Sequence, residues 1–157
     1  MSLPLQPGTW IIDPAHSTVE FTVRHLGISK VRGRFHTFQA SAQIGSDLSS
    51  SSMSAEIDLS SIDTGNADRD AHLRTTDFFD LAAHPQLSFR STAIIDQGDG
   101  RYRVSGNLTL NGRSHNQDLI VEFNGTEIFP VDGSTHAGFT ATGTLSRADY
   151  GVKFDVP

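Results

Sequence analysis

Apolar and polar residues alternate along most of the chain, which is the pattern of β-strands that bury one face. The clearest run covers residues 102–110, where Tyr102, Val104, Leu108 and Leu110 alternate with mostly polar positions. Shorter runs with the same two-residue period cover residues 18–24, 31–36, 54–59, 87–91, 118–123 and 137–145. The pattern predicts antiparallel strands with one face turned toward a shared core.

The segments between these runs contain residues that are typical of turns. Asn111-Gly112 separates two alternating runs and predicts a tight hairpin with positive φ at both central residues. The segments 97–100 and 131–133 combine aspartate with glycine and predict further turns. The serine-rich segment 47–54 is expected to be an exposed loop.

One segment, residues 66–83, departs from the strand pattern and predicts a short helical insertion. Asn66 can cap a first short helix, and Thr76 or Asp77 a second. We expect the insertion to pack as a lid over the mouth of a barrel. The apolar residues that would allow this packing are Leu73, Phe78, Phe79 and Leu81.

Many strands in series with one helical excursion predict an all-β fold, an antiparallel barrel of about eight strands. The length of 157 residues suits a single domain over residues 1–157. A barrel of this size encloses either side chains or one small ligand. Small residues at inward positions leave room for a ligand or relieve curvature at barrel corners, and both interpretations stay open at this point. These residues are Gly33, Gly106, Ala141 and Gly143.

The amino-acid composition disfavours or excludes several kinds of partner and site. The 12 basic and 18 acidic residues give a formal charge of −6, which disfavours nucleic acid and anionic membrane surfaces as partners. There is no cysteine, so disulfides, thiolate nucleophiles and cysteine-based zinc sites are excluded. No segment has the length and apolar character of a membrane span, and residues 1–9 do not resemble a signal peptide. We therefore expect a cytoplasmic protein.

A search for catalytic groups finds one weak candidate. The seven histidines lack the spacing of a metal motif, so we expect no metal site, and there is no Gly-x-Ser-x-Gly elbow. Asp68 and His72 are four residues apart and could share a helix face, with Asp70 as another possible partner of His72. An enzyme that acts on a lipid through these residues is one hypothesis. We favour the structural interpretation, in which they cap and tether the helix.

Arginine and phenylalanine supply the candidates for binding. A guanidinium group matches phosphate in bidentate fashion, so an arginine near the barrel mouth could hold an anionic head group. Taken one at a time, these arginines are better explained as solvated surface residues; they are Arg24, Arg32, Arg34, Arg69, Arg74 and Arg90. The phenylalanines are core residues by default, but in a barrel the core and a ligand cavity share one surface.

Several long motifs in order resemble those of the YceI-like family. The opening motif is residues 10–27, and 31–35 resembles the strand that follows it. The central signature is matched by 61–66, 69–74 and 77–80, and later positions by 84–91, 106–112 and 147–151. The resemblance extends from Trp10 to Val152, nearly the whole chain.

The resemblance implies a lipocalin-like antiparallel barrel whose interior binds polyisoprenoids or related amphiphiles, including isoprenoid quinones, without catalytic residues. It also implies that residues 69–79 lie beside the barrel. Carried over position by position, it suggests that five residues line the interior: Phe21, Val23, Phe35, Phe89 and Leu108.

The leading hypothesis is therefore a carrier, storage or sensing protein for an isoprenoid or fatty amphiphile. No cofactor is expected apart from such a bound lipid or quinone. An interaction module with a side-chain-filled lumen is a further alternative. The full set of expected ligand contacts is Phe21, Val23, Phe35, Phe38, Ile57, Leu73, Phe78, Phe79, Phe89, Leu108, Phe139, Arg34 and His25.

The chain departs from the family pattern at its end. Family members usually continue past the Asp-Tyr-Gly region with a glycine-rich turn and a final strand, whereas this sequence stops at Pro157. Either further residues supply that strand or the barrel closes differently. A missing strand would leave an unpaired sheet edge, so a homodimer is expected as one possible outcome.

Overall fold

The computed structural model describes residues 4–25, 29–75 and 81–152, without the side chains of residues 24, 25 and 29. Within these ranges there are ten strands, one α-helix and four short 3-10 helices. The strands are β1 (Gly8–Ile11), β2 (Val19–His25), β3 (Ser29–Phe35), β4 (Phe38–Ile44), β5 (Ser52–Asp58), β6 (Ile62–Asp63), β7 (Gln86–Gly98), β8 (Arg101–Leu110), β9 (Arg113–Ile128) and β10 (Thr135–Thr142). The helices are η1 (Pro14–His16), η2 (Leu48–Ser50), η3 (Leu59–Ser61), α1 (Ala67–Leu73) and η4 (Ala148–Tyr150).

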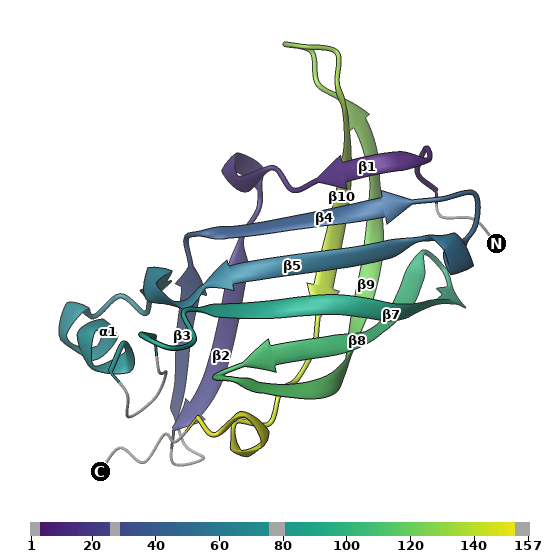
Figure 1. Ribbon diagram of the computed structural model, residues 1–157. Coiled ribbons are helices and arrows are strands. Elements are labelled where there is room, and N and C mark those ends of the chain that lie inside the picture. Colours follow the sequence, from purple (N-terminus) through teal and green to yellow (C-terminus); the bar gives the residue numbers. More distant parts are fainter. Residues whose placement is uncertain (1–3, 26–28, 76–80, 153–157) are drawn as a thin grey trace.

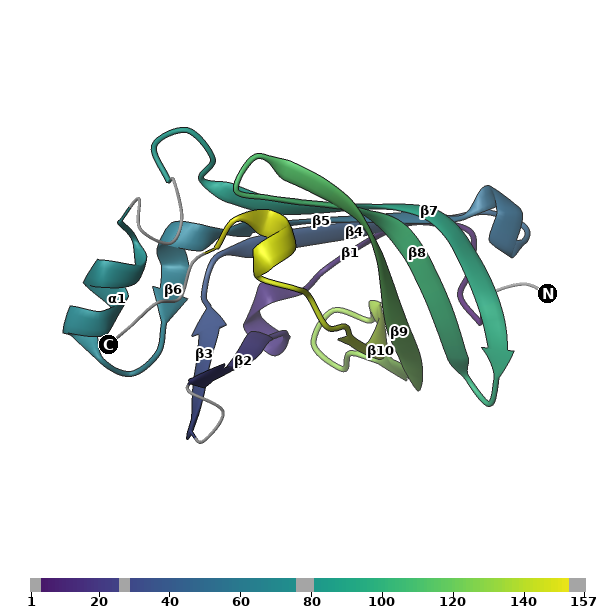
Figure 2. The same ribbon diagram turned by 90° about the horizontal axis from the view of Figure 1, so that it is seen from below.

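The strands form two antiparallel sheets (Figure 1). A seven-stranded sheet has the order β1-β4-β5-β7-β8-β9-β10, and a three-stranded sheet has the order β2-β3-β6. Figure 2 shows the large sheet curving into an arch, with β7, β8 and β9 descending on one side, while β2 and β3 of the small sheet descend on the other side of the molecule. The arch is a half-barrel, so the predicted all-β, antiparallel, barrel-like class is confirmed. The described strands number ten rather than about eight.

Local irregularities help the long strands to bend. The register of β7 against β8 shifts between Ser91 and Ala93, and that of β9 against β10 shifts between Gly138 and Phe139. Such bulges increase twist and curve a strand. The predicted hairpin at Asn111-Gly112 is confirmed, since φ is 56° at Asn111 and 75° at Gly112.

The differences from the predicted elements lie in segments with weak patterns. β1, β4 and β6 were not predicted: β4 carries small residues such as Ala40 and Ala42 inside, and β6 has two residues. The prediction of a loop in the serine-rich segment 47–54 is partly wrong, because η2 forms within it and β5 begins at Ser52. The last run was predicted too long, since β10 ends at Thr142.

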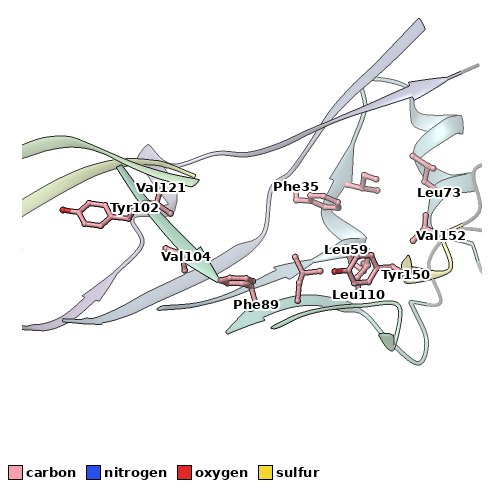
Figure 3. Close-up of a cluster of buried hydrophobic side chains, with 12 residues drawn as sticks. Phe35, Leu59, Leu73, Phe89, Tyr102, Val104, Leu110, Val121, Tyr150 and Val152 are labelled. Atoms are coloured by element: carbon pink, nitrogen blue, oxygen red, sulfur yellow. The ribbon is translucent and has the colours of Figure 1, made fainter. Parts of the chain in front are cut away.

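Buried apolar side chains form one continuous cluster beneath the arch (Figure 3). In Figure 3 the cluster extends from Tyr102 and Val121 at one end to Leu73 and Val152 at the other. Leu59 and Tyr150 are the most deeply buried large side chains, at 1% exposure each. Burial of one leucine-sized side chain contributes about 1.5–3 kcal/mol, so this cluster is the main source of stability.

Helix α1 begins where the sequence predicts. The Asn66 side chain accepts a hydrogen bond from the Arg69 amide at 3.0 Å, which caps the helix. Leu73, at its end, is buried in the apolar cluster. The predicted second helix, with its cap at Thr76 or Asp77, falls on residues 76–80, outside the described residues. No helix in the described part of the chain is long and apolar enough to span a bilayer.

Candidate functional site: the concave face of the half-barrel

The concave face of the arch carries a large cluster of apolar side chains. Alternation turns every second side chain of β5, β7, β8 and β9 toward this face. Its deepest members belong to the buried cluster, and others are only partly covered by protein atoms. The partly buried members on the strands of the arch are Met53, Ile57, Leu87, Ile94, Leu119 and Phe123. A surface of this kind can bind an apolar chain without any polar contact.

Most of the predicted ligand contacts lie in or beside this surface. Phe35, Leu73, Phe89 and Leu108 are buried in the cluster, at 3–9% exposure. Phe21 and Ile57 are partly buried and pack against it. Deep burial means that the first four shape the floor, whereas the partly buried side chains keep surface that a ligand can cover.

Phe139 is the most exposed of the predicted apolar contacts that the structure describes. It is 41% exposed on β10, and its ring centroid lies 5.3 Å from that of Phe123 on β9. Phe38 and Val23 are partly exposed on β4 and β2. Phe38 also lines a small cavity with Val19 and Phe35. These positions stay predicted contacts.

Of the remaining four predicted contacts, three are not described and the fourth, Arg34, is exposed. Phe78, Phe79 and the side chain of His25 lie outside the described residues. Arg34 is exposed on β3, with Nη2 3.9 Å from Glu20 Oε1. Its contact with an anionic head group stays a prediction.

Two other candidate arginines have structural partners. Arg74 donates to the carbonyl oxygens of Ser60 and Ile62 at 2.9 and 3.0 Å. Arg69 donates to the carbonyl and hydroxyl oxygens of Thr64, both at 2.8 Å. These bonds tie α1 to η3 and β6, so both guanidinium groups hold the fold together.

The space above three of the interior glycines is filled by other parts of the protein. A Cβ atom built on Gly33 would lie 2.5 Å from Cζ of Phe21, and one on Gly106 would lie 2.6 Å from Cζ of Phe89. A Cβ on Gly143 would lie 2.6 Å from a methyl carbon of Leu119. Side chains of neighbouring strands therefore occupy the space above each glycine. The interpretation of these glycines as ligand volume is wrong.

The candidate catalytic group on α1 has a structural explanation. Asp70 is 7% exposed, and its carboxylate accepts hydrogen bonds from the amide and hydroxyl of Thr64, with amide distances of 3.0 and 3.1 Å. Asp68 and His72 are exposed on the same helix. The carboxylate of Asp70 is thus committed to fixing the β6–α1 connection, which agrees with the structural interpretation.

The two edges of the large sheet are linked by side chains. Asp13 follows β1, and its Oδ2 lies 2.8 Å from His16 Nδ1 and 3.7 Å from His136 Nδ1 on β10. Phe129 stacks on His136, with ring centroids 4.1 Å apart, and meets His16 edge-on at 5.4 Å. We call Asp13, His16, Phe129 and His136 the seam cluster.

Electrostatics in the seam cluster favour the ionised carboxylate. The hydrogen bond from His16 lowers the pKa of Asp13 below its usual value, and a bond from the Ala15 amide acts in the same direction. Within the described residues, no three histidine, aspartate or glutamate side chains are arranged to hold a metal ion.

Tyr150 belongs to the buried cluster but was not among the predicted contacts. It is 1% exposed on η4, and its ring meets that of His115 edge-on at 5.0 Å. Asn111 donates to its carbonyl oxygen at 3.2 Å, and Gly151 ends η4 with φ of 64°. The only sequence signal was the 147–151 motif, which carries no strand periodicity and so pointed to no inward side chain.

Comparison with known proteins gives a consistent result. A family model described as the YceI-like domain matches residues 10–156. A UPF0312 protein of Vibrio parahaemolyticus is 36% identical over 162 residues, covering 100% of this chain and 83% of that protein. The crystal structure of BcnA from Burkholderia cenocepacia has a TM-score of 0.79 and 25% identity, covering 90% of this chain and 84% of its own.

A more distant structure shares the fold alone. A polyisoprenoid binding domain from Saccharophagus degradans has a TM-score of 0.53 and 18% identity, covering 92% of this chain and 77% of its own. The resemblance found in the sequence motifs is confirmed by the family model, which matches the same stretch of chain from Trp10 onward. Because that match spans nearly the whole sequence and the relatives align along its length, the chain belongs to the YceI-like family.

Proposed function

We propose that the concave face binds a long-chain amphiphile, such as a polyisoprenoid, an isoprenoid quinone or a similar lipid. The observation that carries the proposal is the apolar cluster beneath the arch, whose partly buried members include Ile57, Ile94 and Phe123. The protein would then act as a carrier, store or sensor of this lipid.

The energetics of an apolar surface favour a long chain over a short one. Burial of each methylene-sized unit contributes about 0.8 kcal/mol, so a five-carbon isoprene unit contributes about 4 kcal/mol. Association itself costs about 4–15 kcal/mol in lost freedom. Several isoprene units are therefore needed for tight binding, whereas an exposed ion pair adds about 0–1 kcal/mol.

The family relationship supports the same class of ligand. The Saccharophagus degradans domain, named as polyisoprenoid binding, shares the fold of this chain. The positions expected to contact the ligand include Phe21 and Phe139, which pack against or beside the same surface.

The first experiment is native mass spectrometry of the purified protein, with organic extraction of any bound lipid. We expect a bound amphiphile, or stoichiometric uptake of an added isoprenoid quinone or prenyl phosphate. Protein that is isolated empty and takes up neither compound would contradict the proposal.

A matched pair of variants tests where the lipid binds. Ile94 and Ile95 are neighbours on β7: Ile94 packs against the apolar cluster, whereas Ile95 is 40% exposed and pairs with Arg103. We expect Ile94→Asp to weaken binding of the isoprenoid quinone more than tenfold, because a carboxylate would be desolvated under the ligand. Ile95→Asp should change affinity less than twofold, and equal losses in both variants would place the ligand elsewhere.

A further inference from the structure

The hydroxyl of Tyr150 is an isolated polar group in the apolar cluster. The side chain comes from η4, which lies at the lower end of the arch in Figure 1. In Figure 3 its hydroxyl points toward the half of the cluster that holds Phe89 and away from Val152. The side chain is 1% exposed, and among the described residues the hydroxyl oxygen has no hydrogen-bond partner.

An unpaired buried hydroxyl is unusual, because a phenylalanine would fill the same space without losing hydrogen bonds to water. The chain has two tyrosines. The other, Tyr102, is 6% exposed at the far end of the cluster, and its hydroxyl is not among the unpaired buried atoms. The missing partner of Tyr150 therefore calls for an explanation specific to this end of the arch.

The residues around the hydroxyl determine which kind of ligand atom can form a hydrogen bond with it. The ring of Tyr150 meets that of His115 edge-on, whereas its hydroxyl points into a cluster of apolar side chains that includes Leu59 and Leu110. Burial raises the pKa of Tyr150, so the phenol stays neutral and acts as a hydrogen-bond donor. A phosphate or carboxylate placed among these leucines would lose its hydration without gaining an opposite charge. A neutral acceptor oxygen carries no such penalty.

We propose that the Tyr150 hydroxyl donates a hydrogen bond to a neutral acceptor oxygen, such as a carbonyl, on the polar group of the bound amphiphile. The inference rests on the proposed lipid-binding function and adds the orientation of the ligand, with its polar group toward η4. Protein atoms cover the hydroxyl, so contact requires a side chain of the cluster to move. Leu59 and Leu110, drawn beside Tyr150 in Figure 3, are the candidates.

The test compares two probes of equal chain length, an isoprenoid methyl ketone and the corresponding isoprenoid hydrocarbon. Affinities are measured by displacement of a fluorescent lipophilic dye from the wild-type chain, from Tyr150→Phe and from the control Tyr102→Phe. We expect Tyr150→Phe to weaken ketone binding about tenfold, equivalent to about 1.4 kcal/mol, and to leave hydrocarbon binding unchanged. Tyr102→Phe should not distinguish the two probes.

Thermal unfolding of the ligand-free variants supplies a second readout. Because the hydroxyl has no partner, we expect Tyr150→Phe to melt at the same temperature as the wild type or higher. A lower melting temperature would mean that the hydroxyl has a structural partner, and the inference would be wrong. Equal weakening of ketone and hydrocarbon would also overturn it while leaving lipid binding intact. A wild-type chain that binds neither probe would refute the proposed function itself.

Discussion

The ring of Phe21 packs against Gly33, and the distances between them predict how much the substitution Gly33→Ala should destabilise the protein. The two residues face each other across β2 and β3. A Cβ at position 33 would lie 2.5 Å from Cζ and 2.7 Å from Cε1 of Phe21, and 3.0 Å from Cγ2 of Thr64. Optimal carbon contacts are about 3.5–4.0 Å, so Gly33→Ala forces the ring or the strand to move by about 1 Å.

The expected cost follows from two opposing effects. Overpacking of a core typically costs about 1–3 kcal/mol. Replacing glycine by alanine also restricts the unfolded chain, which favours folding by about 0.4–1 kcal/mol. We therefore expect Gly33→Ala to lower the free energy of unfolding by about 1–2 kcal/mol. For a domain of this size that corresponds to a fall in melting temperature of roughly 2–8 °C.

Urea and thermal unfolding, followed by circular dichroism, measure the effect in a double-mutant cycle with Phe21→Leu. Leucine lacks the Cζ and Cε1 atoms that make the two closest contacts, so Gly33→Ala should cost much less in that background, where the 3.0 Å approach to Thr64 remains. The coupling energy should then be about 1–2 kcal/mol. Gly138→Ala is the matched control, because its nearest heavy atom would be 3.5 Å away, an ordinary contact.

Two results would refute this reasoning. The first is a Gly33→Ala protein as stable as Gly138→Ala, which would mean that the space above Gly33 is open. The second is an undiminished cost in the Phe21→Leu background, which would assign the clash to another neighbour. Only the first result would return Gly33 to the residues that leave room for a ligand.

Two further predictions concern carboxylates. Asp70→Ala removes the acceptor for the amide and hydroxyl of Thr64, and we expect it to cost about 2–3 kcal/mol in urea unfolding, because a part-buried donor loses a charged partner. The exposed Asp68→Ala should cost less than about 0.5 kcal/mol, and equal costs would count against the structural role. Because the pKa of Asp13 is lowered, chiefly by His16, its ionised form favours folding above the unfolded pKa of about 3.9, and this contribution disappears as the pH falls through the folded value. In a carboxyl NMR titration, His16→Ala should raise the midpoint of Asp13 toward its usual value, and an unchanged midpoint would disprove the contact.

The strands that the sequence predicted best are those with large apolar residues on one face. In β8, Tyr102, Val104 and Leu108 alternate with polar neighbours, and the strand extends over Arg101–Leu110 as expected. β4 was missed because Ala40 and Ala42 give alternation without a strong apolar signal. Of these two alanines, Ala42 lies opposite the larger Met53 on the adjacent β5, whereas Ala40 lies opposite Ala55.

The candidate site was predictable only in part, since register decides which side chains share a space. Phe21 and Phe89 were expected to face inward, and they do. That their rings cover Gly33 and Gly106 depends on the pairing of neighbouring strands, which periodicity does not fix. Tyr150 lies in a 3-10 turn after the last described strand, where no periodic signal indicates that its side chain is buried.

The seam cluster has a consequence for the kinetics of ligand exchange. Separating any two neighbouring strands of the large sheet breaks a ladder of backbone hydrogen bonds, but β1 and β10 are the ends of the strand order. Near the seam, the described contacts between the segment after β1 and the β9–β10 hairpin are those of Asp13 and His16 with Phe129 and His136. A chain-like molecule that leaves sideways between these edges has fewer hydrogen bonds to break than one passing elsewhere through the sheet. Hydrogen exchange at the amides of β1 and β10 would report how often that route opens.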